Sequence, residues 1–207
     1  MKENEIVRLN EMWTIENGLF EHGFGTIAGV DEAGRGPLAG DVYAAAVILP
    51  RGICIEGLND SKKLKEKKRE KLYDEICGCA VSYAVATASV AEIDEINIRN
   101  ATYLAMNRAL SALSVPPEYV IVDGDCITNC AFPHECVIKG DAKSASIAAA
   151  SILAKVSRDR KMIELDGKYP EYGFAKHKGY GTKVHIAALK EHGACEIHRK
   201  TFIKKFV

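Results

Sequence analysis

Two short apolar segments of the chain each lead directly into acidic side chains. Residues 26–30 are mostly apolar and partly β-branched, which is typical of a strand, and Asp31 and Glu32 follow them. Residues 119–122 form a continuous apolar run, the pattern of a strand buried on both faces, and Asp123 follows it. Because ligand sites collect where the ends of strands meet, we expect these carboxylates to lie together.

Asp31 and Glu32 are neighbours, and neighbouring side chains of a regular strand point to opposite faces. Both can serve one site only if the chain leaves the strand at that point, which Gly34 and Gly36 would allow. We therefore expect the strand to end before Asp31. The alternative is a solvated acidic turn that closes a hairpin, since Asp and Gly are ordinary turn residues.

A fourth acid, Asp141, precedes an alanine-rich segment that predicts a helix. Ser144 or Ser146 can cap this helix, and residues 148–151 leave little side-chain bulk beside the sheet, so close docking should fix Asp141. The four carboxylates have no His or Cys among them, and hard oxygen ligands of this kind select Mg²⁺ or Mn²⁺. Two such ions about 4 Å apart activate the attacking water and stabilise the leaving oxygen in phosphoryl displacement.

The composition indicates a globular protein of one large domain, or of one domain with a terminal appendage. The 207 residues are 47% hydrophobic and 27% charged. Lys and Arg number 28, as do Asp and Glu, so the chain as a whole is not strongly basic. From Lys155 onward, however, thirteen Lys and Arg stand against six Asp and Glu. A basic region beside an acidic site suits a polyanion that one part holds and another part cuts.

The seven cysteines are odd in number and scattered, as expected of reduced thiols. With no stretch approaching a membrane-spanning length, we expect a cytoplasmic protein. A zinc cluster is an alternative, although its C-x3-C-x3-H-x-C pattern fits poorly with the usual ligand spacings of zinc. Its ligands would be Cys126, Cys130, His134 and Cys136.

Seven Lys and Arg crowd residues 62–71, which follow a possible helix cap at Asp60 or Ser61. A charge run of this kind is usually a solvated helix face, and the pattern alone favours that interpretation. The functional alternative is phosphate binding at a helix N-terminus, with Lys62 and Lys63 beside the amide donors.

The remaining segments alternate between strand-like and helix-like patterns. Residues 41–49 follow the first strand so closely that an antiparallel hairpin is favoured. Residues 1–22 predict an amphipathic helix that buries Trp13. From about residue 169, a basic loop rich in Tyr and Gly suits contact with a nucleic-acid backbone. Further strands are expected at 80–88 and 136–139, and further helices at 90–113 and 183–191.

Five motifs occur in an order that resembles type 2 ribonuclease H, the bacterial ribonuclease HII family. They are GVDEAGRGPLAG, LNDSKKL, YVIVDGD, KGDAKSASIAAASILAKVSRD and YPEYGFAKHKGYGT, and they span about residues 27 to 189. The resemblance implies an α/β ribonuclease H-like fold in one domain, 1–207: a five-stranded mixed sheet flanked by helices, with a C-terminal helical extension. It also implies endonucleolytic cleavage of RNA in RNA–DNA hybrids and at single ribonucleotides embedded in duplex DNA. The ends produced would be a 3′-hydroxyl and a 5′-phosphate.

The resemblance also assigns roles to individual residues. Tyr180 matches the tyrosine that packs against the RNA–DNA junction, and Asp125 is the alternative for the third acid. The family's metal-binding acids, which would hold two Mg²⁺ or Mn²⁺ ions, fall on Asp31, Glu32, Asp123 and Asp141. The motif that reads the ribose 2′-hydroxyl falls on Gly34, Arg35 and Gly36, and the residues that would hold substrate phosphates are Asn59, Asp60, Ser61, Lys62 and Lys63.

Three rival functions are disfavoured. A dinucleotide-binding turn is disfavoured because Pro37 and the strand-like residues 42–49 stand where the phosphate-binding helix should begin. The type 3 ribonuclease H branch typically carries a sizeable N-terminal domain, whereas about 25 residues precede the first strand here. A binding protein without catalysis should lack one of the four acids. All four are present.

The expected partners are nucleic acids: RNA–DNA hybrids and duplex DNA with embedded ribonucleotides. We expect a monomer that contacts no membrane. A replication clamp or a polymerase is a possible protein partner, with Phe202, Ile203 and Phe206 as exposed anchors. The same three side chains would equally well cap the core.

Overall fold

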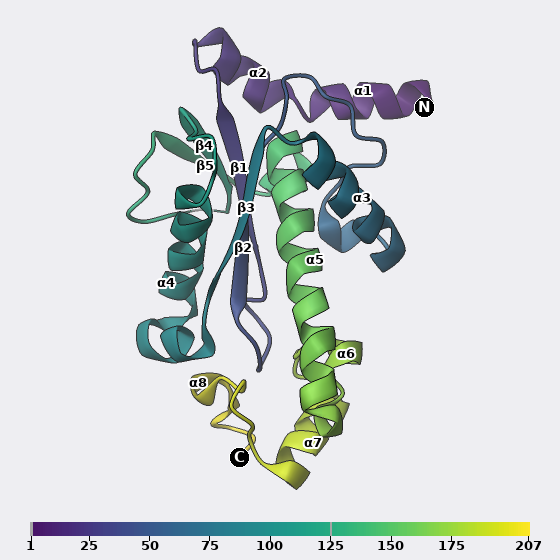
Figure 1. Cartoon of the computed structure of the whole chain (residues 1–207), viewed down its shortest axis with the longest axis vertical. Helices are drawn as coiled ribbons and strands as arrows, with labels where there is room; N and C mark the ends of the chain where they lie inside the picture. The colour runs from purple at the N-terminus through teal and green to yellow at the C-terminus, as the bar shows by residue number, and fades with distance from the viewer. Residues whose placement is uncertain (1, 125) are drawn as a thin grey trace.

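The computed structural model describes residues 2–124 and 126–207, and its centre is a five-stranded mixed sheet (Figure 1). The strand order is β3-β2-β1-β4-β5. Strands β1, β2 and β3 pair antiparallel, whereas β4 runs parallel to β1 and β5 parallel to β4. The predicted mixed sheet and its first hairpin are thereby confirmed. The strands are β1 (Ile27–Ala33), β2 (Val42–Ile48), β3 (Ser82–Ala88), β4 (Tyr119–Asp123) and β5 (His134–Val137).

One long helix covers each face of the sheet (Figure 1). Helix α4 (Val90–Ser111) covers one face, and α5 (Ala145–Lys168) crosses the other, close to β1. The approach of α5 requires Gly29, because a Cβ atom there would lie 2.2 Å from the carbonyl carbon of Ser146. The alternation of strand side chains then puts Asp31, two residues beyond Gly29, on the same face.

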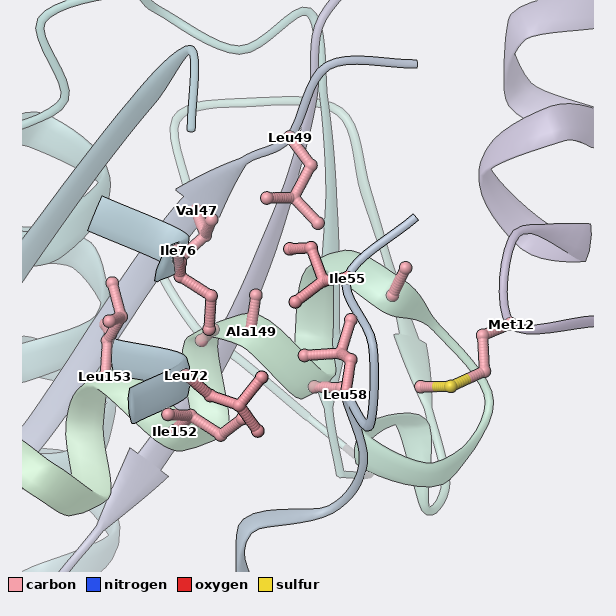
Figure 2. Packing of buried hydrophobic residues seen from close by; sticks show 14 of the residues in the cluster. Met12, Val47, Leu49, Ile55, Leu58, Leu72, Ile76, Ala149, Ile152 and Leu153 are labelled. Atoms are coloured by element: carbon pink, nitrogen blue, oxygen red, sulfur yellow. The ribbon is translucent and has the colours of Figure 1, made fainter. Parts of the chain in front are cut away.

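A hydrophobic core fills the space between α5, the sheet and α3 (Glu66–Cys79) (Figure 2). Leu72 and Ile76 of α3 are fully buried against Ile152 of α5 and Val47 of β2. Each such side chain contributes roughly 1.5–3 kcal/mol relative to an exposed one, so this layer fixes α5 against the sheet. The N-terminal end of α5, which follows Asp141, is thereby held in place.

The N-terminal segment forms two helices, so the prediction of one helix over residues 1–22 is wrong. Helix α1 (Glu3–Glu11) and helix α2 (Thr14–Glu21) are separated by Met12 and Trp13. Both intervening side chains are buried, and the Trp13 indole donates a hydrogen bond to the Ile53 carbonyl oxygen at 3.0 Å. Met12 and Trp13 pack into the core cluster that also contains Ile55 and Leu58, and the predicted burial of Trp13 is confirmed.

Helix α4 is interrupted, which its sequence pattern did not indicate. Asn97 has φ +67°, and its Oδ1 accepts hydrogen bonds from the backbone N–H groups of Arg99 and Asn100 at 3.0 and 3.1 Å. Asn97 therefore caps the second half of the helix. At the true start, Ser89 and Glu92 form a reciprocal capping box.

Two predicted boundaries are shifted. Helix α3 begins at Glu66, and Asp60 caps a separate 3₁₀ turn, η1 (Ser61–Lys63), instead. Strand β5 ends at Val137, two residues before the predicted end. A second 3₁₀ turn, η2 (Gly140–Ala142), carries Asp141, and Ser144 caps α5 as expected.

Four short elements follow α5, and of these α6, α7 and α8 lie toward the end of the molecule away from α1 and α2 (Figure 1). Ile203 is buried against Leu38 and Leu189, so of the two alternatives for this side chain the core-capping one is confirmed. Phe202 and Phe206 are partly buried against the same cluster and cap the core. The four elements are η3 (Pro170–Tyr172), α6 (Phe174–His177), α7 (Lys183–His192) and α8 (Lys200–Ile203).

None of the helices described in residues 2–124 and 126–207 is long and apolar enough to cross a membrane.

Candidate active site

The structure brings three of the four predicted acids together. Asp31, Asp123 and Asp141 each offer a carboxylate oxygen, and these oxygens lie within 4.8 Å of one another. Asp31 and Asp123 are neighbours because Val30 of β1 pairs with Val122 of the parallel strand β4. Asp141 reaches them from η2, which connects β5 to α5. We call these three residues the acid cluster.

Glu32 lies beside the acid cluster but is not one of its members. The expectation that the strand ends before Asp31 is wrong, because β1 continues to Ala33 and pairs with β2 over its whole length. Neighbouring strand side chains leave the backbone on opposite sides, yet Glu32 stays beside the cluster, because it lines a cavity together with Lys62, which contacts Asp141. The Glu32 carboxylate lies 3.6 Å from the Arg35 guanidinium. Burial raises the pKa of Glu32, and the charge of Asp123 raises it further, which shows that the cluster remains within electrostatic reach.

Backbone groups fix the orientation of the clustered carboxylates. Gly140 N–H donates to Asp123 Oδ1 at 2.6 Å, and Glu32 N–H donates to Asp31 Oδ1 at 2.7 Å. A Cβ atom at position 140 would lie 2.6 Å from Ile147 Cδ1 and 3.3 Å from Asp123 Oδ1, so a larger residue there would crowd both side chains. The carboxylates are thus oriented before any ligand arrives.

The acid cluster carries an excess of negative charge. Burial, followed by the charges of Glu32 and Asp123, raises the pKa of Asp31 well above its usual value. Burial and the charge of Asp123 also raise the pKa of Asp141. Lys62 Nζ lies 3.4 Å from Asp141 Oδ2. Burial opposes charge on Lys62, but the attraction of Asp31 and Asp141 outweighs it and raises the pKa of Lys62.

One ammonium group does not neutralise three clustered carboxylates and a fourth beside them. The donor set consists of hard oxygen atoms, which Mg²⁺ and Mn²⁺ prefer, and close like charges are stabilised by a bound cation. The residues present therefore fit a divalent metal site.

Two cavities adjoin at Lys62. The larger, of about 390 Å³, lies at the acid cluster, and the smaller, of about 180 Å³, lies beside the loop that follows β1. The larger is lined by Asp60, Lys62, Lys63, Asp123, Lys139, Asp141 and Ala142. The smaller, which we call the loop cavity, is lined by Glu32, Ala33, Gly34, Arg35, Gly36, Ser61, Lys62, Lys155 and Tyr180.

Glycines shape the wall of the loop cavity. Gly34 has φ +100°, and a Cβ atom there would lie 2.2 Å from Arg158 Nε, so both its conformation and its packing require glycine. Gly36 is exposed, and a Cβ atom there would lie 3.7 Å from a ring carbon of Tyr180. The Tyr180 side chain, 44% exposed, therefore closes the loop cavity opposite Gly36.

The predicted phosphate-binding segment divides into two parts. Asn59 Oδ1 and Asp60 Oδ1 accept backbone hydrogen bonds at 2.9 Å within the turn, and Ser61 N–H donates to Ser151 Oγ at 3.3 Å. These three residues shape η1 and dock it on α5. Lys62 and Lys63 are exposed and face the cavities.

Asp125, the alternative for the third acid, lies outside the described residues. Several residues near the site were not predicted from the sequence. Lys155 and Lys139 line the two cavities, and Arg158 and Arg199 are buried behind the loop cavity. The signal for Arg158 was present in the sequence, because a charged residue there follows a mostly apolar helical segment.

The comparisons with known proteins decide the family. The family model described as Ribonuclease HII matches residues 28–205. The chain belongs to the ribonuclease HII family. A ribonuclease HII of Caldicellulosiruptor bescii is 55% identical over 204 residues, which cover 97% of this chain and 99% of that relative. The predictions of a ribonuclease H-like fold and of a metal-dependent endoribonuclease are thereby confirmed.

Solved structures of a ribonuclease H2 and of a ribonuclease HII have the same fold. The ribonuclease H2 of Pyrococcus horikoshii superposes with a TM-score of 0.73 at 29% identity, covering 88% of this chain and 97% of that one. The ribonuclease HII of Archaeoglobus fulgidus, solved in its complex with PCNA, gives 0.68 at 27% identity, covering 85% and 94%.

Proposed function

We propose that this ribonuclease HII cleaves the RNA strand of RNA–DNA hybrids and nicks duplex DNA 5′ of single embedded ribonucleotides. The products would carry a 3′-hydroxyl and a 5′-phosphate, and the role would be ribonucleotide removal in DNA replication and repair. The observation that carries this proposal is the junction of the two cavities at Lys62. A phosphate at the acid cluster and a neighbouring ribose in the loop cavity would be bound together.

The acid cluster and Glu32 would hold the metal. When bound, two Mg²⁺ or Mn²⁺ ions would supply activation of the attacking water and stabilisation of the leaving oxygen. The chain's own contribution is orientation, because Gly140 N–H and Glu32 N–H already fix the Asp123 and Asp31 carboxylates. Lys62, at the junction of the cavities, would bind the phosphate that is to be cut, and the exposed Lys63 a neighbouring one.

Recognition of the ribonucleotide would belong to the loop cavity. The 2′-hydroxyl is what distinguishes RNA from DNA at a given position, and the absence of side chains at Gly34 and Gly36 lets backbone groups approach it. Arg35, which lies 3.6 Å from Glu32 with a side chain 55% exposed, would reach a phosphate from this position. The exposed ring of Tyr180 would pack against the nucleotide at the junction.

The nucleic acid would be bound by a monomer. The PCNA complex of the Archaeoglobus relative makes a sliding clamp a candidate partner of this chain as well. Burial of Ile203 leaves the partly exposed Phe202 and Phe206 as the anchors for such a contact.

The test is incubation with a DNA duplex that carries one ribonucleotide, in Mg²⁺, in Mn²⁺ and in chelator, alongside the Asp123→Asn protein. We expect a metal-dependent nick on the 5′ side of the ribonucleotide, absent in the variant, while the variant still binds the duplex. Cutting confined to long RNA–DNA hybrids would contradict the role given to Gly34, Arg35 and Gly36. Cleavage retained by Asp123→Asn would move the metal site elsewhere.

A further inference from the structure

A fully buried arginine holds the loop that forms the loop cavity. Arg199 donates from Nη2 to the Gly34 carbonyl oxygen at 2.6 Å, from Nη1 to that of Arg35 at 3.0 Å, and from Nε to that of Gly40 at 2.9 Å. Among the described residues no carboxylate forms an ion pair with it. Burial lowers the pKa of Arg199 to about 9, with the nearby Arg158 adding to the shift, so the guanidinium stays charged at neutral pH.

These contacts determine where the loop's donors point. In a trans peptide the carbonyl oxygen and the following N–H lie on opposite sides of the chain. The Gly34 and Arg35 carbonyl oxygens face Arg199, so the N–H groups of Arg35 and Gly36 face away from it. Neither N–H has a hydrogen-bond partner in the part of the chain that the structure describes. Arg199 thus presents two donors toward a ligand.

A chain of histidines holds the other side of the loop cavity. Cys195 N–H donates to His198 Nδ1 at 3.0 Å, so His198 carries its proton on Nε2 and donates to His185 Nε2 at 3.0 Å. His185 then carries its proton on Nδ1 and donates to the Tyr180 carbonyl oxygen at 2.9 Å. Burial lowers the pKa of both rings, to about 4 for His198, which keeps both neutral.

The backbone joins the three segments concerned. Arg199 N–H donates to the Leu38 carbonyl oxygen and Gly40 N–H to that of Ile197, both at 2.8 Å. Leu38 N–H donates to the Gly179 carbonyl oxygen, next to Tyr180, also at 2.8 Å. The residues after Arg199 are anchored in turn, because the Asp94 carboxylate on α4 accepts the N–H groups of Lys200 and Thr201 at 2.9 Å.

We propose that His198 and Arg199 are positioning residues that set the two opposite walls of the loop cavity, His198 through His185 and Tyr180, Arg199 through the Gly34–Arg35 peptide groups. The inference rests on the proposed function of that cavity, the recognition of a ribonucleotide. Neither residue needs to touch the substrate. Because His198 and Arg199 are adjacent in the sequence, one short segment, 195–199, sets the distance between the two walls.

The experiment compares binding of two DNA duplexes, one with a single ribonucleotide and one without, by fluorescence anisotropy in Mg²⁺. All proteins carry Asp123→Asn so that no cleavage intervenes. We expect this parent to prefer the ribonucleotide duplex, and Arg199→Lys and His198→Ala each to lose about fivefold of that preference, the effect of about one hydrogen bond. Affinity for the all-DNA duplex should stay within about twofold, because the exposed lysines are unchanged. His198→Gln, whose amide can donate to His185, should restore part of the preference.

A core variant separates positioning from general loss of stability. Ile76→Val alters the buried layer between α3 and α5, and it should lower the melting temperature without changing the preference. A preference that falls equally in Ile76→Val, or persists in both Arg199→Lys and His198→Ala, would overturn the inference. A parent without any preference would instead refute the proposed function of the loop cavity, and the inference with it.

The tautomers of His198 and His185 can be measured independently of binding, in protein that keeps both histidines. Ring ¹⁵N NMR should show His198 protonated on Nε2 and His185 on Nδ1. The reverse pattern, or exchange between both tautomers, would overturn the assignment of His198 whatever the binding data show.

Discussion

The ammonium group of Lys62 lies 3.4 Å from the carboxylate of Asp141, 79 residues away in the sequence. Lys62 also lies where the acid cluster and the loop cavity meet. A divalent ion at the cluster would experience this ammonium as a like charge, whereas a substrate phosphate would experience it as a partner. Lys62 therefore opposes one ligand and favours the other.

Removing this charge should separate the two effects. Lys62→Gln should bind Mn²⁺ about twofold to fivefold more tightly without substrate, as expected for a half-exposed ion pair, and should bind duplex DNA more weakly. Isothermal titration calorimetry measures the first and anisotropy the second. Lys63→Gln is the control, because Lys63 forms no ion pair in the described structure and should affect DNA binding alone. Weaker Mn²⁺ binding by Lys62→Gln would contradict the argument.

The two glycines of the loop should respond differently to alanine. Gly34→Ala places a Cβ 2.2 Å from Arg158 Nε at φ +100°, so we expect it to lower the unfolding free energy by about 1–3 kcal/mol. At Gly36 a Cβ makes ordinary contact with Tyr180, so Gly36→Ala should keep its melting temperature. It should nevertheless lose ribonucleotide preference, because the methyl group occupies the approach to the backbone. Differential scanning fluorimetry and duplex binding check the pair.

Replacing Tyr180 should distinguish its ring from its hydroxyl. The hydroxyl has no hydrogen bond within the described part of the chain, and the side chain is 44% exposed. If the ring packs against the nucleotide, Tyr180→Phe should cut nearly as well as the parent. Tyr180→Ala should lose about 1–3 kcal/mol of transition-state stabilisation, the usual value for stacking on a base. The kcat/KM for nicking of the single-ribonucleotide duplex should be measured for both variants. Equal losses in Tyr180→Phe and Tyr180→Ala would implicate the hydroxyl.

The buried histidines should make stability depend on pH. The pKa of His198 is about 4 in the folded protein and about 6.5 when exposed, so the unfolded state binds more protons between these values. The stabilisation that comes from neutral His198 should therefore be fully present above about pH 6.5. The unfolding free energy should fall by roughly 3 kcal/mol as the pH is lowered toward 4. The lowered pKa of His185 acts in the same direction. Urea denaturation at several pH values in this range gives the slope of unfolding free energy against pH. This slope should be shallower in His198→Gln, and an unchanged slope would refute the assignment.

A buried glutamate joins the N-terminal segment to α5. Glu16 Oε1 accepts hydrogen bonds from Ser144 Oγ at 2.6 Å and from Ser146 N–H at 3.0 Å, and burial raises the pKa of Glu16. Glu16→Ala leaves these buried donors without their acceptor, which should cost about 1–3 kcal/mol of unfolding free energy. Glu21→Ala, an exposed change in the same helix, is the control and should have little effect. Chemical denaturation provides both values.

Local patterns predicted the strands and most helices because each follows from neighbouring residues. The continuous apolar run before Asp123 identifies β4, and the closeness of residues 41–49 to β1 identifies the hairpin. Two helix breaks escaped prediction, one beside a distant contact and one at an unusual local backbone conformation. The indole of Trp13 reaches Ile53 at the first break, and the interruption of α4 depends on the φ +67° conformation of Asn97.

The acid cluster was predictable and the support behind the loop cavity was not. Asp31 and Asp123 come at the ends of two parallel strands that pair in this register, so the two side chains must lie close together. Side-chain alternation and strand topology are therefore enough to predict the acid cluster. Arg199, in contrast, contacts Gly34 across 165 residues of sequence, and no local pattern records such a contact. The predicted end of β1 was wrong for a related reason, because pairing with β2 keeps the strand regular beyond Asp31.

The long reach of Arg199 also orders events during synthesis. Asp141 is made 58 residues before Arg199, so a chain growing at ~5–20 residues per second holds all four acids for roughly 3–12 seconds before that guanidinium exists. During this interval the Gly34 and Arg35 carbonyl oxygens have no guanidinium to orient them. Helix α5, which holds Asp141 in place, is also made before Arg199, so the acid cluster has all its supporting elements before the loop cavity has its own.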